Sequence, residues 1–227
     1  EPTVRSHVSL PVVPTSIAWT AAGKLMLAMP PSVKSRLLLL DVLESAVPNA
    51  DMAPSIALAS PAVAIVEAPS HYDGCTGGGA TTVFALCQDK KLHVYEIPKV
   101  GAVGQAVQPL SSYSSHEKMP TALALSPDGN FVATAAKDGF TVVRSLMRIE
   151  DPVKLELHDS VLGGVAALVL VPNVSPAAIP GSALVYSCGA DGVMFMTVAN
   201  PIGKSKATPP SYVARPLQLP EAAEKEA

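Results

Sequence analysis

Short apolar runs separated by turn residues are the main pattern in this chain. The clearest example is residues 119–146, MPTALALSPDGNFVATAAKDGFTVVRSL, where Ser126–Gly129 and Lys137–Gly139 divide three apolar runs. Proline and glycine favour turns because proline restricts the backbone dihedrals and glycine frees them. The stretch therefore predicts three antiparallel strands, Thr121–Leu125, Phe131–Ala135 and Phe140–Leu146.

Three further units of three strands are predicted, with single outer strands between the units. The apolar run Leu37–Leu40 is typical of a strand covered on both faces, and its short length between turn residues disfavours a helix. Residues Val100–Gln108, rich in Gly and Ala, are predicted to be a connection. The strands of the three units are Ser16–Thr20, Lys24–Met29, Arg36–Val42, Ala62–Glu67, Thr81–Cys87, Lys91–Ile97, Val165–Val171, Ala183–Cys188 and Val193–Val198, and the outer strands are Ser55–Ala59, Pro109–Tyr113, Val153–Leu157 and Tyr212–Leu217.

The four units repeat at a nearly constant interval. Their third strands align on Leu40, Tyr95, Arg144 and Thr197, at intervals of 55, 49 and 53 residues. A β-propeller blade is a small sheet of four strands, and its repeat is roughly 40–50 residues long. The predicted fold is therefore all-β, a β-propeller segment of about four blades that forms a partial or incomplete ring.

The domain organisation follows from this repeat. Residues 1–14 are predicted to form an extended N-terminal segment, in which Val8, Leu10 and Val12 alternate as in a half-buried strand. Residues 15–201 are predicted to hold the blades, and residues 202–227 a C-terminal strand and a charged tail. The chain opens with Glu1 rather than methionine, so we expect a piece of a longer protein.

Polar residues recur at the same relative places in two of the units. The third unit holds His116, Thr134 and Asp138, and its Ser-Pro-Asp-Gly turn precedes the second strand. The fourth unit holds His158, Ser187 and Asp191 at corresponding places. The second unit keeps Asp89 and, on the third strand, Tyr95-Glu96, whereas the first unit keeps only Asp41.

These residues resemble the WD-repeat family. In that family a His, a Ser or Thr, an Asp and a Trp form a hydrogen-bonded tetrad inside each blade. The resemblance implies that His116, Thr134, Asp138, His158, Ser187 and Asp191 are structural tetrad residues. Arg144 and Thr197 replace the tryptophan in the third and fourth units, so the chain resembles a divergent member of the family. Four units are also fewer than the seven usual in the family.

Composition and charge exclude several classes of protein. Charged residues make up 15% of the chain, well below the roughly 25% of an average domain, and the net charge is −3. Nucleic-acid binding requires a basic surface, so no nucleic-acid partner is expected. No apolar run approaches the about 20 residues of a membrane-spanning helix, so no membrane partner is expected either.

The cysteines and glycines predict no metal or cofactor site. Cys75, Cys87 and Cys188 are widely spaced and form no CxxC pair, which argues against zinc and favours reduced thiols in the cytoplasm. The glycine-rich stretch Asp73–Gly79 lacks the Gly-Lys-Ser/Thr ending of a phosphate-binding loop. Cys87 and His93 are a conceivable nucleophile and base, but a core cysteine and a histidine on the strand face are the favoured interpretation.

The favoured function is a non-enzymatic scaffold for protein–protein interactions, with no cofactor. A His, a hydroxyl and an Asp that recur in successive repeats fit a structural network, whereas a catalytic site is needed once. Partners are expected to bind rim loops such as Pro69–Ala80 and Pro172–Gly181, within a large complex. The resemblance extends to cytoskeletal and ciliary WD-repeat subunits, so the expected locations are the cytoplasm, the cytoskeleton and the axoneme of a cilium.

Two alternatives remain open from the sequence. One is a hydrolase or other enzyme built on a propeller that uses His116 or His158. The other is a lumenal or extracellular propeller, for which Asn173-Val174-Ser175 has the form of a glycosylation acceptor.

Overall fold

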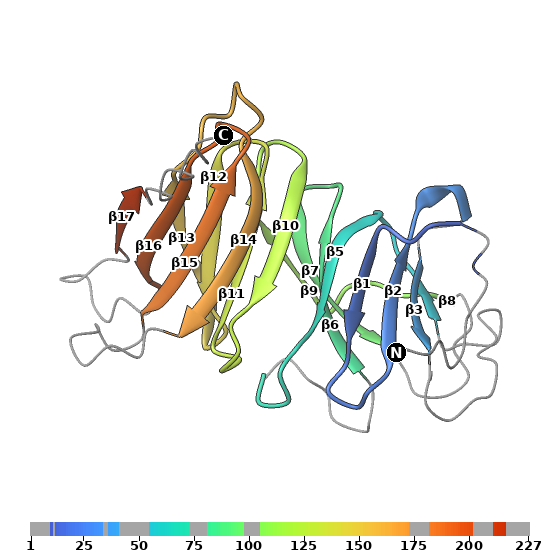
Figure 1. Cartoon of the computed structure of the whole chain (residues 1–227). Coiled ribbons are helices and arrows are strands. Elements are labelled where there is room, and N and C mark those ends of the chain that lie inside the picture. Colours follow the sequence, from blue (N-terminus) through green and yellow to red (C-terminus); the bar gives the residue numbers. More distant parts are fainter. Residues whose placement is uncertain are drawn as a thin grey trace, which may run out of the picture.

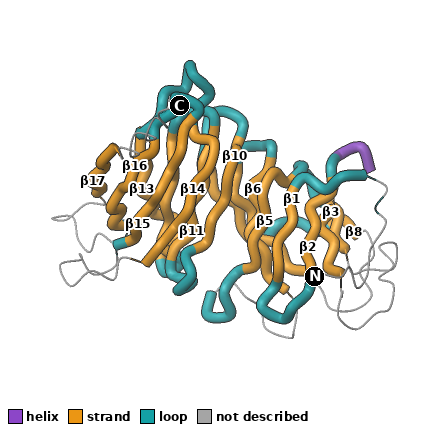
Figure 2. Tube along the Cα trace, viewed as in Figure 1, coloured by secondary structure: helices purple, strands orange, loops and turns teal. Residues whose placement is uncertain are grey.

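The computed structural model describes residues 10, 12–33, 36–40, 55–72, 81–97, 105–172, 182–201 and 211–216. Within these residues the regular structure is β-strand, apart from the short 3₁₀ helix η1 (Pro31–Val33). The strands form four sheets that stand side by side in a row (Figure 1). Loops join the strands at both edges of this row (Figure 2).

Each sheet is built around strands that follow one another in the chain and pair antiparallel, and the first sheet gains β8 (Gln105–Ala106) as a parallel edge strand. The first sheet contains β1 (Ser16–Trp19), β2 (Leu25–Met29), β3 (Arg36–Leu40), β4 (Ser55–Ala57) and β8. The second contains β5 (Ala62–Glu67), β6 (Thr81–Cys87), β7 (Lys91–Ile97) and β9 (Ser111–Ser114). The third contains β10 (Pro120–Leu125), β11 (Phe131–Ala136), β12 (Phe140–Ser145) and β13 (Arg148–Glu156), and the fourth β14 (Val165–Pro172), β15 (Ala183–Gly189), β16 (Met194–Asn200) and β17 (Ser211–Pro216).

The prediction of an all-β propeller segment with four blades is confirmed. The three-strand units and their outer strands lie where the sequence pattern predicts them, within two residues at their described ends, except that β13 begins at Arg148 rather than at Val153. One prediction about a connection is wrong: Val100–Gln108 contains β8, which pairs parallel with β4. A strand of two residues is too short to show an alternating pattern, so the sequence does not predict it. β8 forms because tertiary contacts bring it beside β4.

The first strand of three sheets carries a bulge at the same place. The register shifts between Ala62 and Ala64 in β5, between Pro120 and Ala122 in β10, and between Val165 and Ala167 in β14. A bulge increases the local twist of a strand and bends it. The recurrence shows that the second, third and fourth sheets share one backbone design, beyond their shared residue pattern.

The sheets pack face to face through apolar side chains. The core between the first and second sheets is centred on residues such as Met26, Ile56 and Tyr95. Phe84, Val94 and Val132 belong to the core between the second and third sheets. A further core fills the space between the third and fourth sheets and includes Phe131, Ala133, Val143, Leu155, Leu168, Leu170 and Val185.

The first strands of neighbouring sheets contact one another. Strands β1, β5, β10 and β14 contact one another in that order. The hydroxyl of Thr15 donates to the carbonyl of Ala62 at 2.7 Å, and that of Thr121 to the carbonyl of Val165 at 2.7 Å. The first and fourth sheets lie at opposite ends of the row, so the ring is open.

The described part of the N-terminal segment contacts the first sheet. Leu10 and Val12 lie outside any strand, and both are half-buried against the apolar cluster of β2 and β3. Residues 1–9 and the charged tail at 217–227 lie outside the described residues, as does Asp41. In the part of the chain that the structure describes, no helix is long and apolar enough to cross a membrane.

Candidate functional site

In the third sheet the structure brings His116, Thr134 and Asp138 together. His116 Nδ1 lies 3.2 Å from Asp138 Oδ2, and His116 Nε2 lies 2.9 Å from Thr134 Oγ1. A carboxylate can only accept, so Nδ1–H donates to Asp138 and the hydroxyl of Thr134 donates to Nε2. The His116 side chain is completely shielded from solvent. Its pKa is lowered by burial, which outweighs the opposing effect of the Asp138 charge, so the ring is neutral.

The fourth sheet repeats this arrangement with His158, Ser187 and Asp191. His158 Nδ1 lies 3.1 Å from each carboxylate oxygen of Asp191, and His158 Nε2 lies 2.9 Å from Ser187 Oγ. Burial tends to raise the pKa of Asp191, but the N–H groups of Val193 and Asp159 and the His158 ring outweigh it and lower that pKa. Gly189 is required here, because a Cβ at that position would collide with His158 and Asp191.

In these two networks the ring nitrogens of the histidines are hydrogen-bonded to other side chains of the protein. Both ring nitrogens of His116 and of His158 are engaged, and the partner hydroxyls of Thr134 and Ser187 are buried. The two histidines form separate networks, one completed by β11 and the turn after it, the other by β15 and the turn after it. A hydroxyl that acts as a nucleophile must reach its substrate, so neither network has the accessibility that the hydrolase alternative needs.

Different side chains occupy the position of the family's tryptophan in the third and fourth sheets. Arg144 is buried, and its guanidinium donates to the carbonyls of Ile149 at 2.6 Å and of Ser114 at 2.7 Å. Its charge also lies 5.4 Å from the ring centre of Tyr113, at cation–π distance. Because Ser114 and Tyr113 belong to β9, Arg144 connects the third sheet to the second. Thr197 in the fourth sheet is buried, and its hydroxyl has no hydrogen-bond partner among the described residues.

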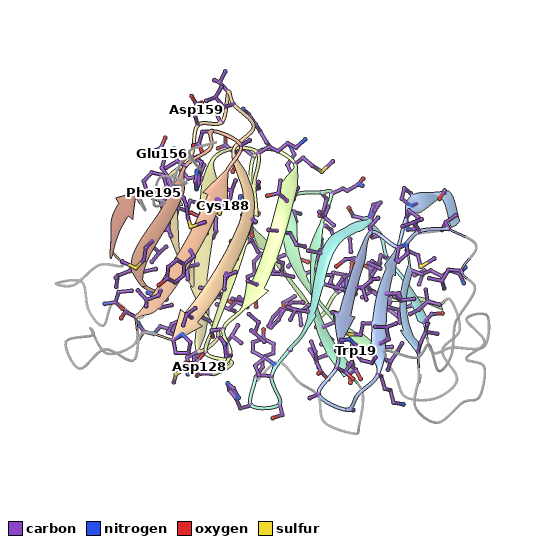
Figure 3. All side chains as sticks on the ribbon, in the orientation of Figure 1. Trp19, Asp128, Glu156, Asp159, Cys188 and Phe195 are labelled. Atoms are coloured by element: carbon purple, nitrogen blue, oxygen red, sulfur yellow. The ribbon has the colours of Figure 1, made fainter. Side chains whose placement is uncertain are left out.

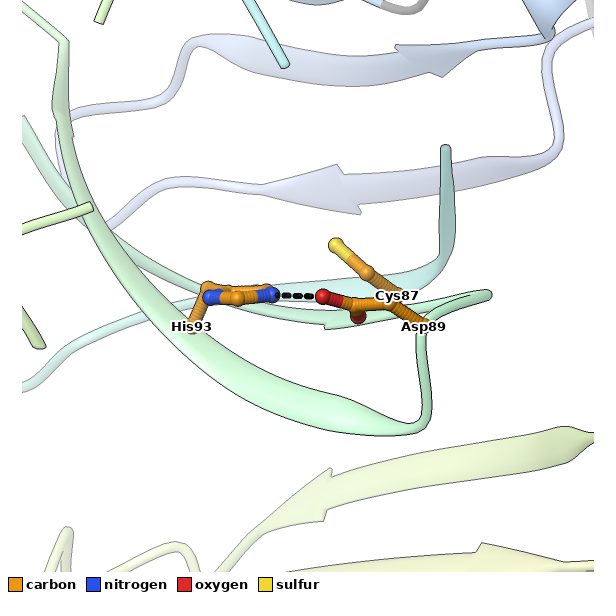
Figure 4. A group of neighbouring side chains, drawn as sticks. All are labelled: Cys87, Asp89 and His93. Atoms are coloured by element: carbon orange, nitrogen blue, oxygen red, sulfur yellow. Dashed lines mark hydrogen bonds and ion pairs between the residues drawn. The ribbon is translucent and has the colours of Figure 1, made fainter. Parts of the chain in front are cut away.

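The second sheet carries a polar network that the repeat pattern does not predict. Asp89 Oδ2 lies 2.8 Å from His93 Nε2, and His93 Nδ1 lies 2.7 Å from Ser112 Oγ. His93 lies on β7 rather than before the first strand, and the second-strand position occupied by Thr134 and Ser187 holds Ala85. Figure 4 shows Cys87 beside this pair. Burial, and then the charge of Asp89, raise the pKa of the Cys87 thiol to about 12, so it is a poor nucleophile.

A turn of common design follows the second strand in these three sheets. Gly139 and Gly192 have φ angles of 86° and 77°, and each directly follows the aspartate of its turn. Lys90 occupies the equivalent position after Asp89 and has a φ of 70°. Left-handed backbone favours glycine, so Lys90 is held there at a cost of about 1–2 kcal/mol.

Five loops form one continuous rim, which we call the upper rim: residues 88–90, 115–119, 137–139, 157–164 and 190–193. The backbone N–H of His116 donates to Lys90, that of His158 to Gly139, and that of Ala190 to Gly164. Figure 3 shows Asp159 at the upper edge of the molecule and Asp128, in the β10–β11 turn, at the opposite edge.

Apolar side chains are exposed on the upper rim. Val161 is 87% exposed, and Leu162, Met119 and Val193 are also solvent-accessible. The loop that carries Val161 is held in place, because Val161 N–H donates to Asp159 Oδ1 at 2.7 Å and Lys118 Nζ contacts the carbonyl of Ser160. We call these four side chains the upper-rim apolar group. Sequence reasoning missed them, since isolated apolar residues in a loop have no periodicity.

The opposite rim is formed by turns between first and second strands. His71 Nε2 lies 3.0 Å from the carbonyl of Gly129, which joins the β5–β6 connection to the β10–β11 turn. The rest of that connection, residues 73–80 with the glycine-rich stretch and Cys75, lies outside the described residues, as do residues 173–181. Cys87 and Cys188 are free thiols.

Comparison with known protein families gives one match. The family model described as WD domain, G-beta repeat, matches residues 107–143, which run from before β9 to β12 and include His116, Thr134 and Asp138. The match supports the resemblance to the WD-repeat family for one repeat of the chain. WD domains generally act as scaffolds for protein–protein interactions. No curated protein matches the chain.

Proposed function

We propose that this chain is a non-enzymatic scaffold that binds other proteins through its rim loops. The observation that carries the proposal is a difference between the buried polar networks and the upper rim. Polar groups at the blade centres bond to one another, whereas apolar side chains on the rim have no covering among the described residues. The family match to a WD repeat supports the same function.

The upper-rim apolar group has the character of a protein-binding site. Scattered apolar residues on a surface are ordinary, but here four of them project from neighbouring loops that hydrogen bonds hold together. Apolar side chains on a pre-ordered loop lose little conformational entropy on binding, so most of the free energy of their burial contributes to affinity. Charged residues such as Glu117, Lys118 and Lys137 surround the group and suit the polar edge of an interface.

The cellular setting is the finer part of the proposal. Degenerate tetrads, long inserts and a charged tail are features shared with large cytoskeletal and ciliary subunits of the family that the sequence resembles. The proposed setting is therefore a large complex in the cytoplasm, at the cytoskeleton or in the axoneme of a cilium. Fluorescent tagging of the chain in ciliated cells tests this setting, and a signal confined to secretory compartments would contradict it.

A matched pair of variants tests binding at the rim. The variant Val161→Ser/Leu162→Ser removes apolar surface from the upper rim, whereas Met147→Ser removes an equally exposed side chain, 82% exposed, from the β12–β13 turn at the opposite rim. Partners are captured by proximity labelling with the wild-type chain and quantified by mass spectrometry. We expect the upper-rim variant to lose its main partners and the control to keep them, with unchanged melting temperatures for both. Equal partner sets in all three proteins would refute binding at this rim.

The inserts provide a second test at the opposite rim. Residues 73–80 and 173–181 each connect a first strand to a second strand, so their ends lie on the same side as the β10–β11 turn. Deleting each insert while keeping the flanking strands tests whether this rim also binds partners. Retention of every partner after both deletions and after the Val161→Ser/Leu162→Ser change would exclude rim binding altogether.

A further inference from the structure

The turn between β6 and β7 gathers three side chains that carry metal-ligating atoms. Cys87 ends β6, Asp89 lies in the turn, and His93 lies on β7. Ala85 pairs with His93 across the two strands, and Cys87 lies two residues beyond Ala85, so Cys87 and His93 share one face of the sheet. One ligand atom from each of the three residues lies within 4.8 Å of the others, and Figure 4 shows the side chains converging.

We propose that Cys87, Asp89 and His93 bind a divalent transition-metal ion of the Zn²⁺ class, with water as the fourth ligand. Thiolate sulfur, imidazole nitrogen and carboxylate oxygen are the three protein ligand types of zinc. Their usual bond lengths place tetrahedral ligand atoms about 3.3–3.6 Å apart. His93 Nε2–H donates to Asp89 Oδ2 at 2.8 Å. When a metal ion takes the place of this proton, the ring proton moves to Nδ1, where Ser112 Oγ accepts it, and Nε2 and Oδ2 separate by about 0.5 Å.

The ligands already have supporting partners. Ser112 Oγ lies 2.7 Å from His93 Nδ1, which fixes the ring with Nε2 toward Asp89 and Cys87. A histidine ligand of a metal ion usually has such a partner on its other nitrogen. The backbone N–H of Asp89 donates to Ser60 Oγ at 3.0 Å, and Asp89 Oδ1 accepts from the N–H of Lys91. These contacts orient the carboxylate from the turn side.

Charge balance fits a dication at this place. Cys87 and His93 are buried, whereas Asp89 is exposed, so water can reach the open position beside the carboxylate. Binding converts the Cys87 thiol to thiolate and releases its proton to solvent. A thiolate and a carboxylate then neutralise the double positive charge, which suits the apolar surroundings of Val83, Ala85 and Tyr95.

The arrangement of Cys87, Asp89 and His93 in the second sheet differs from the corresponding networks of the third and fourth sheets. Asp138 and Asp191 are held by a histidine from an earlier loop and, through it, by a hydroxyl on the second strand. Ala85 replaces that hydroxyl in the second sheet, and Asp89 pairs instead with His93 from its own turn. The sequence predicts no metal site, because that prediction rests on the absence of a CxxC pair. It does not take into account that strand pairing brings a cysteine and a histidine of neighbouring strands close together. The site does not depend on the proposed function.

Cobalt substitution tests the site directly. In a Cys75→Ser/Cys188→Ser background Cys87 is the single thiol of the chain. Tag-free protein is freed of metal by a chelator and titrated with Co²⁺ and then Zn²⁺. We expect one equivalent of Co²⁺ to give an intense near-ultraviolet sulfur-to-cobalt band, which Zn²⁺ removes on displacement. Absence of that band, or equal binding by the Cys87→Ser variant, would overturn the proposal.

Single substitutions separate the roles of the residues. We expect Cys87→Ser and His93→Gln to weaken Zn²⁺ binding in calorimetry by more than about 100-fold, and Ser112→Ala by about 10-fold or more. Asp89→Asn is the variant least at risk of unfolding because its side chain is exposed, and we expect it too to weaken binding by about 10-fold or more. As a check that needs no substitution of a ligand, Zn²⁺ should slow alkylation of Cys87 in the single-thiol background. An unchanged alkylation rate, or undiminished affinity in Asp89→Asn, contradicts the site.

Discussion

The hydroxyl of Thr134 offers a sharp test of whether the blade networks stabilise the fold. The change Thr134→Val keeps the shape of the side chain but removes the group 2.9 Å from His116 Nε2. The control is Thr141→Val in the neighbouring strand of the same sheet. Thr134 and Thr141 are 1% and 0% exposed, but Thr141 Oγ1 has no hydrogen-bond partner in the described structure.

The two changes are expected to differ in their effect on the free energy of unfolding. Thr134→Val leaves the buried Nε2 of His116 without a donor, which costs about 1–3 kcal/mol. Thr141→Val removes a buried hydroxyl that bonds to nothing described, so it should leave the stability unchanged or raise it by up to about 1 kcal/mol. For a chain of this size, about 1 kcal/mol corresponds to about 2–4 °C in melting temperature.

Urea and thermal unfolding followed by circular dichroism measure both variants. The fourth sheet provides an independent repeat, since Ser187 bonds to His158 whereas the hydroxyl of Thr197 is buried without a partner among the described residues. Ser187→Ala should therefore destabilise the protein and Thr197→Val should not. If Thr134→Val and Thr141→Val have the same effect, the hydrogen bond to His116 is not a source of stability and the structural interpretation of these residues fails.

Two further predictions concern protonation and backbone strain. Because burial lowers the pKa of His116 below 6.5, the unfolded state takes up a proton first, so stability should fall as the pH drops from about 6.5 toward the folded-state pKa. His116→Gln should reduce this slope, by at most about 1.4 kcal/mol per pH unit, in unfolding free energies measured between pH 7.5 and 5; an unchanged slope would exclude His116 as the titrating group. Lys90→Gly should raise the melting temperature, because relief of the left-handed strain at φ 70° exceeds the entropy cost of glycine, whereas Gly192→Ala at φ 77° should lower it. A lower melting temperature for Lys90→Gly would contradict this account.

The strand pattern was predictable from the sequence because turn residues and apolar runs act locally. Pro127, Gly129 and Gly139 end strands through backbone preferences that need no tertiary contact. The polar repeat was also visible, since in both units a histidine precedes the first strand and the hydroxyl residue lies four positions before the aspartate. The structure places those groups within hydrogen-bond distance in both sheets. The use of Arg144 as a bridge to Ser114 was not predictable, because it depends on the neighbouring sheet.

The sequence by itself determined the number of blades and the residue types of the polar network in the third and in the fourth blade, because strand alternation and repeat spacing are properties of the chain alone. Only the tertiary structure decided which side chains meet across strands and loops. Cys87 and His93 come together through the register of β6 and β7, and Met119 and Val161 join one rim through contacts between successive sheets. These contacts depend on how strands and sheets pack in space, and the order of residues in the sequence does not specify that packing.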